Sequence, residues 1–311
     1  MRSTSRRPKR RSGRGSRRPD RLFRLASLPF CFEPEGALHP EERAALQDLA
    51  DASDGPAAGP AFRIVLERRK GVEAGTPTAE AARVSWGDGL CRLEHDLFEA
   101  EVDVLGGRAR IRRTEGPAIG LITTLRIALS GGLPVRGGLV IHAAGMEHEG
   151  RGLVFFGPSG IGKTTLATRS PWPMLSDELV ALLPRGAGEA YRVSGTAFRR
   201  PVPGSRAPAV ADPKLLALVE LAQGPGFELE KLDPPVALRR LLGSITVPPG
   251  PPLWTAALAV VGGLVRDVPC YRMAWSLDES PFEPLASALG LSAVLPDSGG
   301  GGSAERLVEG L

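Results

Sequence analysis

The segment GLVFFGPSGIGKTTLA, at residues 152–167, decides the fold that this sequence predicts. Gly152–Phe156 is a short apolar run typical of a buried strand. Gly157–Thr164 then matches GxxxxGK[ST], the Walker A pattern. A helix opens at Thr165-Leu166-Ala167, and Ser170-Pro171 must end it within about two turns. A strand, a glycine-rich loop and a helix in this order predict an α/β domain that binds the phosphates of a nucleotide.

The residue types of this loop suit a triphosphate. Glycines let consecutive backbone N–H groups converge on a phosphate, and the start of the following helix adds partial positive charge. Lys163, one of only five lysines in the chain, would place an ammonium on the β- and γ-phosphates, and the Thr164 hydroxyl would bind Mg²⁺. The expected nucleotide-binding residues are Gly157, Pro158, Ser159, Gly160, Ile161, Gly162, Lys163, Thr164 and Thr165.

Two adjacent acids, Asp177 and Glu178, stand between apolar residues in MLSDELVAL, at residues 174–182. Carboxylates in an apolar strand are costly unless they face a cation. Because neighbouring strand residues point to opposite faces, the two acids are not expected to perform the same task. The alternative is a solvated turn between two strands.

Four segments together resemble the HPr kinase/phosphorylase-like (HPr serine kinase C-terminal domain-like) branch of the phosphoenolpyruvate-carboxykinase-type P-loop fold. They are IHAAGM (141–146), FFGPSGIGKTTLA (155–167), LSDELVAL (175–182) and VSGTAF (193–198). The order and spacing of the segments agree with that family, and the resemblance extends over about residues 135–275.

The resemblance implies an active site made of the strand histidine, the loop lysine, the loop hydroxyl and the first acid of the pair. It implies that Asp177 acts as base when a serine hydroxyl attacks the γ-phosphate, and that Glu178 is a magnesium ligand or a neighbour of one. The expected catalytic residues are therefore His142, Lys163 and Asp177, and the expected metal ligands are Thr164, Asp177 and Glu178. A lone histidine on an apolar strand is more often a core residue, so this alternative stays open for His142.

The sequence also departs from the family. The stretch between loop and acids is shorter, the second acid is Glu instead of Asp, and a later glycine-rich segment with a metal-binding Glu is not found. The first 130 residues do not match the usual partner domain of HPr kinases. The chain thus looks like a divergent member, of the kind found beside peptide-modification gene clusters.

The N-terminal part of the chain has a different composition. Residues 1–21 are rich in Arg, Ser, Gly and Pro and are expected to be a disordered basic tail. Such a tail could bind nucleic acid or acidic lipid by charge alone, but a solvated arm, or a start codon assigned too far upstream, is the preferred interpretation. Region 22–134 is expected to be β-rich, with a helix near Glu41–Ala52 and a linker at Asp51–Pro60. Short strands at 62–66, 82–86, 89–93, 98–104 and 109–111 predict an antiparallel sheet, followed by a buried helix at 119–129.

The kinase-like domain is expected at 135–296, with a flexible tail at 297–311. Strands are predicted at 138–144, 152–156, 180–183, 190–193 and 270–275, and helices from Pro234, at 253–265 and at 281–288. Leu215–Leu221 is ambiguous between strand and helix. The expected fold is α/β: a P-loop NTP-binding domain of the PEP-carboxykinase/HPr-kinase type with an N-terminal β-rich α+β region.

Other residue types give weaker signals. His39, His95 and His148 are predicted at the surface, and Trp254 and Trp275 in the core. Arg199, Arg200 and Arg206 would either neutralise transferred phosphate or belong to a solvated loop. Three cysteines far apart suggest neither a disulfide framework nor a zinc site, and the longest apolar run, Pro251–Val265, is too short to span a bilayer. We therefore expect a cytoplasmic protein without a membrane or nucleic-acid partner.

The sequence predicts an ATP- and Mg²⁺-dependent kinase of the HPr-kinase-like kind. It would transfer the γ-phosphoryl group to a Ser or Thr hydroxyl of a small protein or peptide. One alternative is a non-catalytic nucleotide-binding accessory protein, and another is a PEP-carboxykinase-like small-molecule enzyme. A homo-oligomer is left open, because no sequence feature bears on it.

Overall fold

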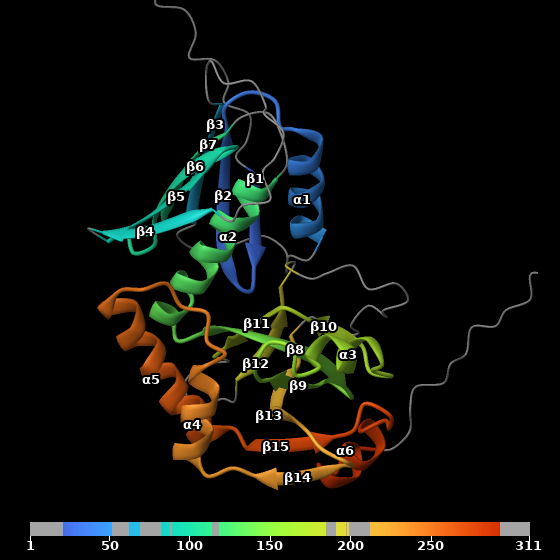
Figure 1. The fold of residues 1–311 in the computed structure, drawn as a ribbon. Helices are drawn as coiled ribbons and strands as arrows, with labels where there is room; N and C mark the ends of the chain where they lie inside the picture. Colours follow the sequence, from blue (N-terminus) through green and yellow to red (C-terminus); the bar gives the residue numbers. More distant parts are fainter. Residues whose placement is uncertain are drawn as a thin grey trace, which may run out of the picture.

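The computed structural model describes residues 21–51, 62–68, 82–87, 89–113, 118–184, 191–196, 198 and 212–292. The expected basic tail, most of the linker, the arginines at 199, 200 and 206 and the C-terminal tail lie outside these residues. Arg21, which was assigned to the tail, instead begins a strand. The described part of the chain is a mixed α/β fold built on two sheets (Figure 1).

Seven strands of the described residues form the N-terminal sheet, in the order β1-β2-β3-β7-β6-β5-β4 (Figure 1). The elements are β1 (Arg21–Leu25), β2 (Leu28–Pro34), α1 (Pro40–Asp51), β3 (Phe62–Arg68), β4 (Arg83–Gly87), β5 (Leu90–His95), β6 (Phe98–Asp103), β7 (Arg108–Arg113) and α2 (Ile119–Gly132). The strands predicted from β3 to β7 are present, but β1 and β2 were not predicted. The expectation of an antiparallel sheet is wrong in part, since β3 runs parallel to both β2 and β7. Helix α1 lies between β2 and β3 in the chain and so allows this parallel pairing.

Helix α2 packs closely on the N-terminal sheet. A Cβ atom on Gly120 would lie 2.6 Å from the ring of Phe98 on β6, and one on Gly131 would lie 2.5 Å from Val104. Both distances are shorter than real side chains allow, so glycine is required at these two points of contact. The predicted burial of this helix is confirmed, because its apolar residues enter the core under the sheet.

The second sheet carries the glycine-rich loop. Its described elements are η1 (Pro134–Arg136), β8 (Leu139–His148), β9 (Arg151–Phe156), α3 (Lys163–Thr168), β10 (Met174–Ser176), β11 (Leu179–Leu183), β12 (Arg192–Gly195), β13 (Lys214–Gln223), β14 (Glu228–Lys231), α4 (Pro234–Leu242), α5 (Pro251–Asp267), β15 (Cys270–Trp275) and α6 (Phe282–Ala288). The ambiguous segment at 215–221 is strand, and β13 runs parallel to both β9 and β15. Because these three strands are parallel, their carboxyl ends meet at the edge where the loop begins.

One hydrophobic cluster of the described residues joins the two sheets, and two further clusters lie within the second sheet and its helices. Val140 of β8 and Leu179, Ala181 and Leu183 of β11 pack in the same cluster as α2 and the N-terminal strands. Helix α2 therefore contacts both sheets, as Figure 1 shows. None of the helices in the described part of the chain combines the length and apolarity that a bilayer crossing requires.

The histidine predictions were only partly right. His148 is buried instead of lying at the surface: its ring stacks on Trp172 at 4.7 Å, and its Nε2 lies 3.1 Å from the Ser292 carbonyl oxygen. Trp172 and Ser292 are distant from His148 in sequence, so the local sequence around His148 could not predict its burial. His39 and His95 are half-buried. Among the tryptophans, Trp275 is buried as predicted, and Trp254 is half-buried.

Candidate functional site

The glycine-rich loop turns directly after β9. Gly157, Gly160 and Gly162 have φ angles of 146°, 80° and 109°, which side-chain-bearing residues rarely adopt. At Gly162 an added Cβ would meet the Trp275 ring at 3.4 Å, an ordinary contact, so the backbone conformation is what favours glycine there. The crest of the loop, Pro158–Gly160, is exposed. The loop thus presents open backbone to solvent at the carboxyl end of a buried strand.

Lys163 lies inside this turn, although lysine is seldom buried. Its side chain is 6% exposed, and its Nζ donates hydrogen bonds to the carbonyl oxygens of Gly157 at 2.8 Å and Pro158 at 2.9 Å. Burial lowers the pKa of the ammonium from its ordinary value. Helix α3 follows and ends before Ser170-Pro171, as the sequence predicts, with Thr164 exposed and Thr165 half-buried. The lysine and the hydroxyl of the Walker A pattern therefore lie together in a compact turn.

His142 lies on β8, next to Leu179 of β11 in the register of the sheet. Its side chain is exposed, so the alternative of a core histidine is wrong. Even so, partial burial of the ring lowers its pKa, and the positive charges of Lys163 and Arg126 lower it further. The Glu178 carboxylate and a hydrogen bond with the Glu178 backbone act in the opposite direction. His142 is thus within electrostatic reach of Lys163, Glu178 and Arg126, and these four residues are called the basic-acidic cluster below.

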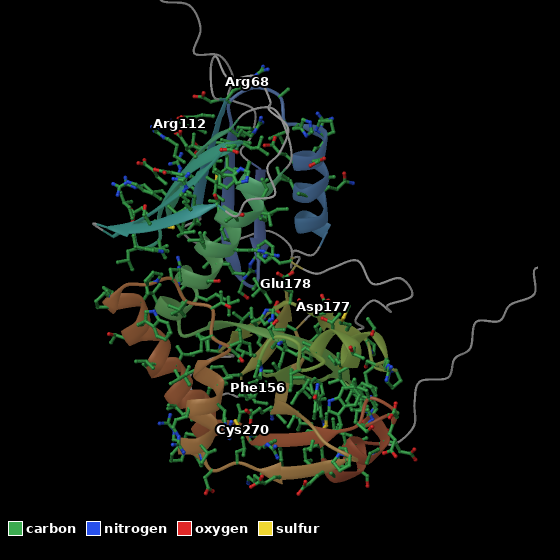
Figure 2. The ribbon with its side chains drawn as sticks, in the orientation of Figure 1. Arg68, Arg112, Phe156, Asp177, Glu178 and Cys270 are labelled. Carbon is green, nitrogen blue, oxygen red and sulfur yellow. The ribbon has the colours of Figure 1, made fainter. Side chains whose placement is uncertain are left out.

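Asp177 and Glu178 occupy the bend between β10 and β11, at the level where the two sheets meet (Figure 2). The alternative of a turn between strands is right in position but wrong in solvation for Asp177, which is only 4% exposed. Glu178 is 24% exposed, and its Oε1 lies 3.0 Å from the terminal nitrogen of Arg126. The cationic partner of Glu178 therefore comes from α2.

Arg126 is the residue of this cluster that the sequence analysis missed. Its guanidinium carbon lies 5.3 Å from the centre of the Phe198 ring, in addition to the Glu178 ion pair. A signal was present in the sequence, because Arg126 is the only charged residue of the helix from Ile119 to Gly132. A single charge on a mostly buried helix is costly unless a partner is nearby.

The expected metal-binding residues, Thr164, Asp177 and Glu178, offer only oxygen donors. Among the described residues, no group of three or more His, Cys, Asp and Glu side chains is arranged to hold an ion. Mg²⁺ is usually bound by one or two carboxylates together with substrate phosphates and waters, so three such side chains are not required. The Thr164 hydroxyl with Asp177 or Glu178 has the chemistry that such an ion takes.

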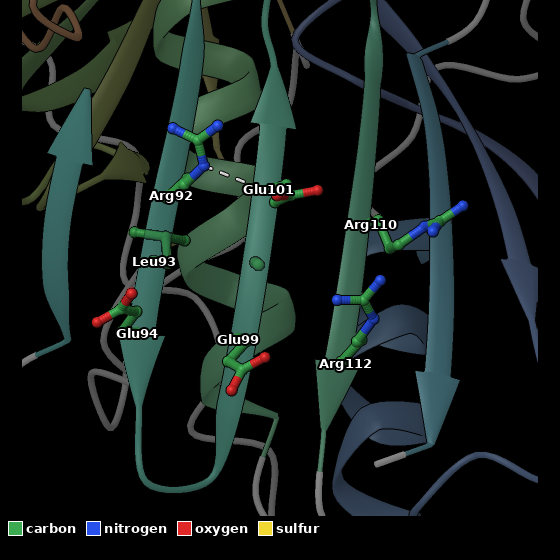
Figure 3. Close-up of a pocket in the computed structure, with 8 residues that line it drawn as sticks. Arg92, Leu93, Glu94, Glu99, Glu101, Arg110 and Arg112 are labelled. Carbon is green, nitrogen blue, oxygen red and sulfur yellow. Dashed lines mark ion pairs between the residues drawn. The ribbon is translucent and has the colours of Figure 1, made fainter. Parts of the chain in front are cut away.

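A pocket on the N-terminal sheet lies away from this cluster (Figure 3). It is lined by Arg92, Leu93, Glu94, Glu99, Ala100, Glu101, Arg110 and Arg112. Several of its charges are already paired: Arg92 lies 3.7 Å from Glu101, and Glu67 lies 3.3 Å from Arg110 and 3.1 Å from Arg112. These cross-strand pairs stabilise the sheet and leave the pocket with little net charge to attract an anion.

Comparisons with known proteins give limited similarity. The family model described as "SynChlorMet cassette protein ScmC" matches residues 122–197, a segment that begins inside α2 and includes the loop and both acids. No curated protein matches the chain. Among solved structures, the HPr(Ser) kinase/phosphatase from Coxiella burnetii is 16% identical, with 41% of this chain and 88% of that chain covered and a TM-score of 0.23. This similarity is weak and at the level of the fold.

Proposed function

We propose that this protein binds ATP and Mg²⁺ and transfers the γ-phosphoryl group to a Ser or Thr hydroxyl of a small protein or peptide, as an HPr-kinase-like enzyme. The observation that carries the proposal is the position of Lys163, buried under a loop whose glycines have positive φ, with His142 close enough to feel its charge. A buried ammonium within a glycine-rich turn whose crest is exposed is an arrangement that suits a phosphate chain.

Each residue has a role in this proposal. The loop amides would hold the β-phosphate, and Lys163 would exchange its bonds to Gly157 and Pro158 for phosphate oxygens. Thr164 and Glu178 would hold the magnesium ion, which neutralises charge on the transferred group. The pKa of His142 is lowered from 6.5, which favours the neutral ring at pH 7. A neutral imidazole would orient the acceptor hydroxyl by a hydrogen bond.

The assignment of Asp177 as the base remains a prediction. Asp177 is 4% exposed, so an acceptor hydroxyl could reach its carboxylate only if the bend between β10 and β11 moved. The same burial favours the second candidate, an accessory protein that binds nucleotide without transferring phosphate.

The two candidates are separated by a binding and transfer experiment. Calorimetry with ATP and Mg²⁺ measures binding, and γ-labelled ATP with a library of Ser- and Thr-containing peptides measures transfer. Peptides with Ala in place of Ser and Thr are the matched acceptors without a hydroxyl. Transfer that is lost in Asp177→Asn but kept in the exposed variant Asp267→Asn, with ATP binding intact in both, supports the kinase. Binding without transfer to any peptide supports the accessory protein, and absence of binding contradicts both.

The division of the chain into regions at 22–134 and 135–296 also stays a proposal. The segment matched by the family model begins at residue 122, inside α2, and so crosses the proposed boundary. If α2 belongs functionally with the loop, the boundary lies before residue 118, and limited proteolysis of the full chain would locate it.

A further inference from the structure

Arg126 is the only charged residue of helix α2, and its side chain is 38% exposed. Helix α2 is otherwise uncharged, and its contacts through Gly120 and Gly131 hold it tightly against the N-terminal sheet. Because the helix backbone is held in place by these contacts, the Cα position of Arg126 is fixed. The guanidinium therefore projects from a fixed base toward the second sheet.

Two contacts then hold the guanidinium. One terminal nitrogen lies 3.0 Å from Glu178 Oε1, and the central carbon lies 5.3 Å from the centre of the buried Phe198 ring. An arginine stacked on an aromatic ring keeps its plane fixed and can still donate hydrogen bonds at its edge. Glu178 is thereby held on the side of the bend that faces α2 and His142.

We propose that Arg126 is a positioning residue of the nucleotide site, which fixes the Glu178 carboxylate for the phosphate-bound magnesium ion. This inference rests on the proposed function. It adds that a residue of α2 holds one of the proposed magnesium ligands in place.

The competing interpretation is that the ion pair only stabilises the fold. The chain offers a matched pair for comparison, Arg112 with Glu67 on the N-terminal sheet. Their separation is 3.1 Å against 3.0 Å, and their exposures are 47% and 21% against 38% and 24% for Arg126 and Glu178. The two pairs are alike in separation and exposure, although Glu67 also pairs with Arg110 and so keeps one partner when Arg112 is removed. Arg112 is a control because its pair lies on the N-terminal sheet and not beside the glycine-rich loop.

The experiment measures ATP affinity of the full chain by calorimetry, once with excess Mg²⁺ and once with EDTA. The ratio of the two dissociation constants gives the magnesium contribution for the wild type, Arg126→Ala, Arg126→Lys, Glu178→Gln and the double variant Arg126→Ala/Glu178→Gln. Arg112→Ala is the control, and thermal unfolding of each variant checks that it is folded. We expect Arg126→Ala and Glu178→Gln each to reduce the magnesium contribution about tenfold, and the double variant to be no worse than either.

The lysine variant keeps the charge without the planar stacking and should retain part of the effect. Arg112→Ala should leave the ratio unchanged. The inference is overturned if Arg126→Ala and Arg126→Lys keep the wild-type ratio while Glu178→Gln lowers it, or if the two single effects multiply in the double variant. A wild type that binds ATP without any magnesium contribution also overturns it but leaves nucleotide binding standing, whereas a wild type that binds no ATP contradicts the proposed function itself.

Discussion

The ammonium of Lys163 donates a hydrogen bond to the carbonyl oxygen of Gly157, six residues before it, at 2.8 Å. The lysine thus closes the glycine-rich loop from inside, and the residues of its crest, Pro158–Gly160, are exposed. A phosphate chain that entered the loop would replace two carbonyl partners of the lysine with anionic oxygens. An ammonium donates a stronger hydrogen bond to an anionic phosphate oxygen than to a neutral carbonyl oxygen, so the exchange favours binding.

Replacing Lys163 with Met should weaken ATP binding about 30-fold or more, because a lost charge-assisted hydrogen bond is worth about 2 kcal/mol. Calorimetry with ATP and Mg²⁺ measures the change. Lys214→Met, at an exposed lysine of β13, is the matched control and should bind as the wild type does. If Lys163→Met keeps its affinity, the loop does not bind a triphosphate.

The His142 ring should titrate below its ordinary pKa of 6.5, because burial and the neighbouring Lys163 charge both disfavour the imidazolium. NMR of the ring protons over pH 5 to 8 measures this, and His142→Gln identifies the signal. In Lys163→Met the pKa should rise, since a positive charge is removed. The folded chain binds fewer protons than the unfolded chain near pH 6, so the free energy of unfolding should fall as the pH drops through this range. A wild-type pKa at or above 6.5 contradicts the electrostatic contact.

The loop and its flanking elements could be predicted from sequence because each depends on its own residues. An apolar run, three glycines and a lysine define β9, the turn and α3 without any distant partner. The same holds for α2, whose apolar residues cover most of the helix surface.

What the sequence did not reveal depends on partners far along the chain. The β2–β3 and β3–β7 pairs are parallel. The residues of one strand do not determine which strand pairs with it or in which direction that strand runs. The contact of Arg126 with Glu178 joins a helix to a bend across the sheet junction. A lone arginine in α2 indicated that a partner exists, but only the fold identifies it.

Gly120→Ala should destabilise the protein by about 1–3 kcal/mol, because the new methyl group would overlap the Phe98 ring. Gly262→Ala on α5 is the control, since an added Cβ there meets nothing within 4 Å. Within a helix, the alanine should stabilise the protein by about 0.5–1 kcal/mol. Urea denaturation of the two variants should therefore give changes of opposite sign. If both variants are stabilised, α2 does not pack on β6 as closely as described.

Cys91 and Cys270 should resist alkylation in the folded protein, because burial raises the pKa of Cys91 to about 12 and that of Cys270 to about 11. Thiolates are the reactive form, so few are present at pH 8. Iodoacetamide treatment followed by peptide mapping should label neither cysteine in buffer, and both in denaturing urea. Cys31, which is half-buried on β2, serves as the internal comparison. Cys91 is completely buried in the core of the N-terminal sheet. If Cys91 were labelled as fast in buffer as in urea, this part of the core would open readily, and the described packing would be contradicted.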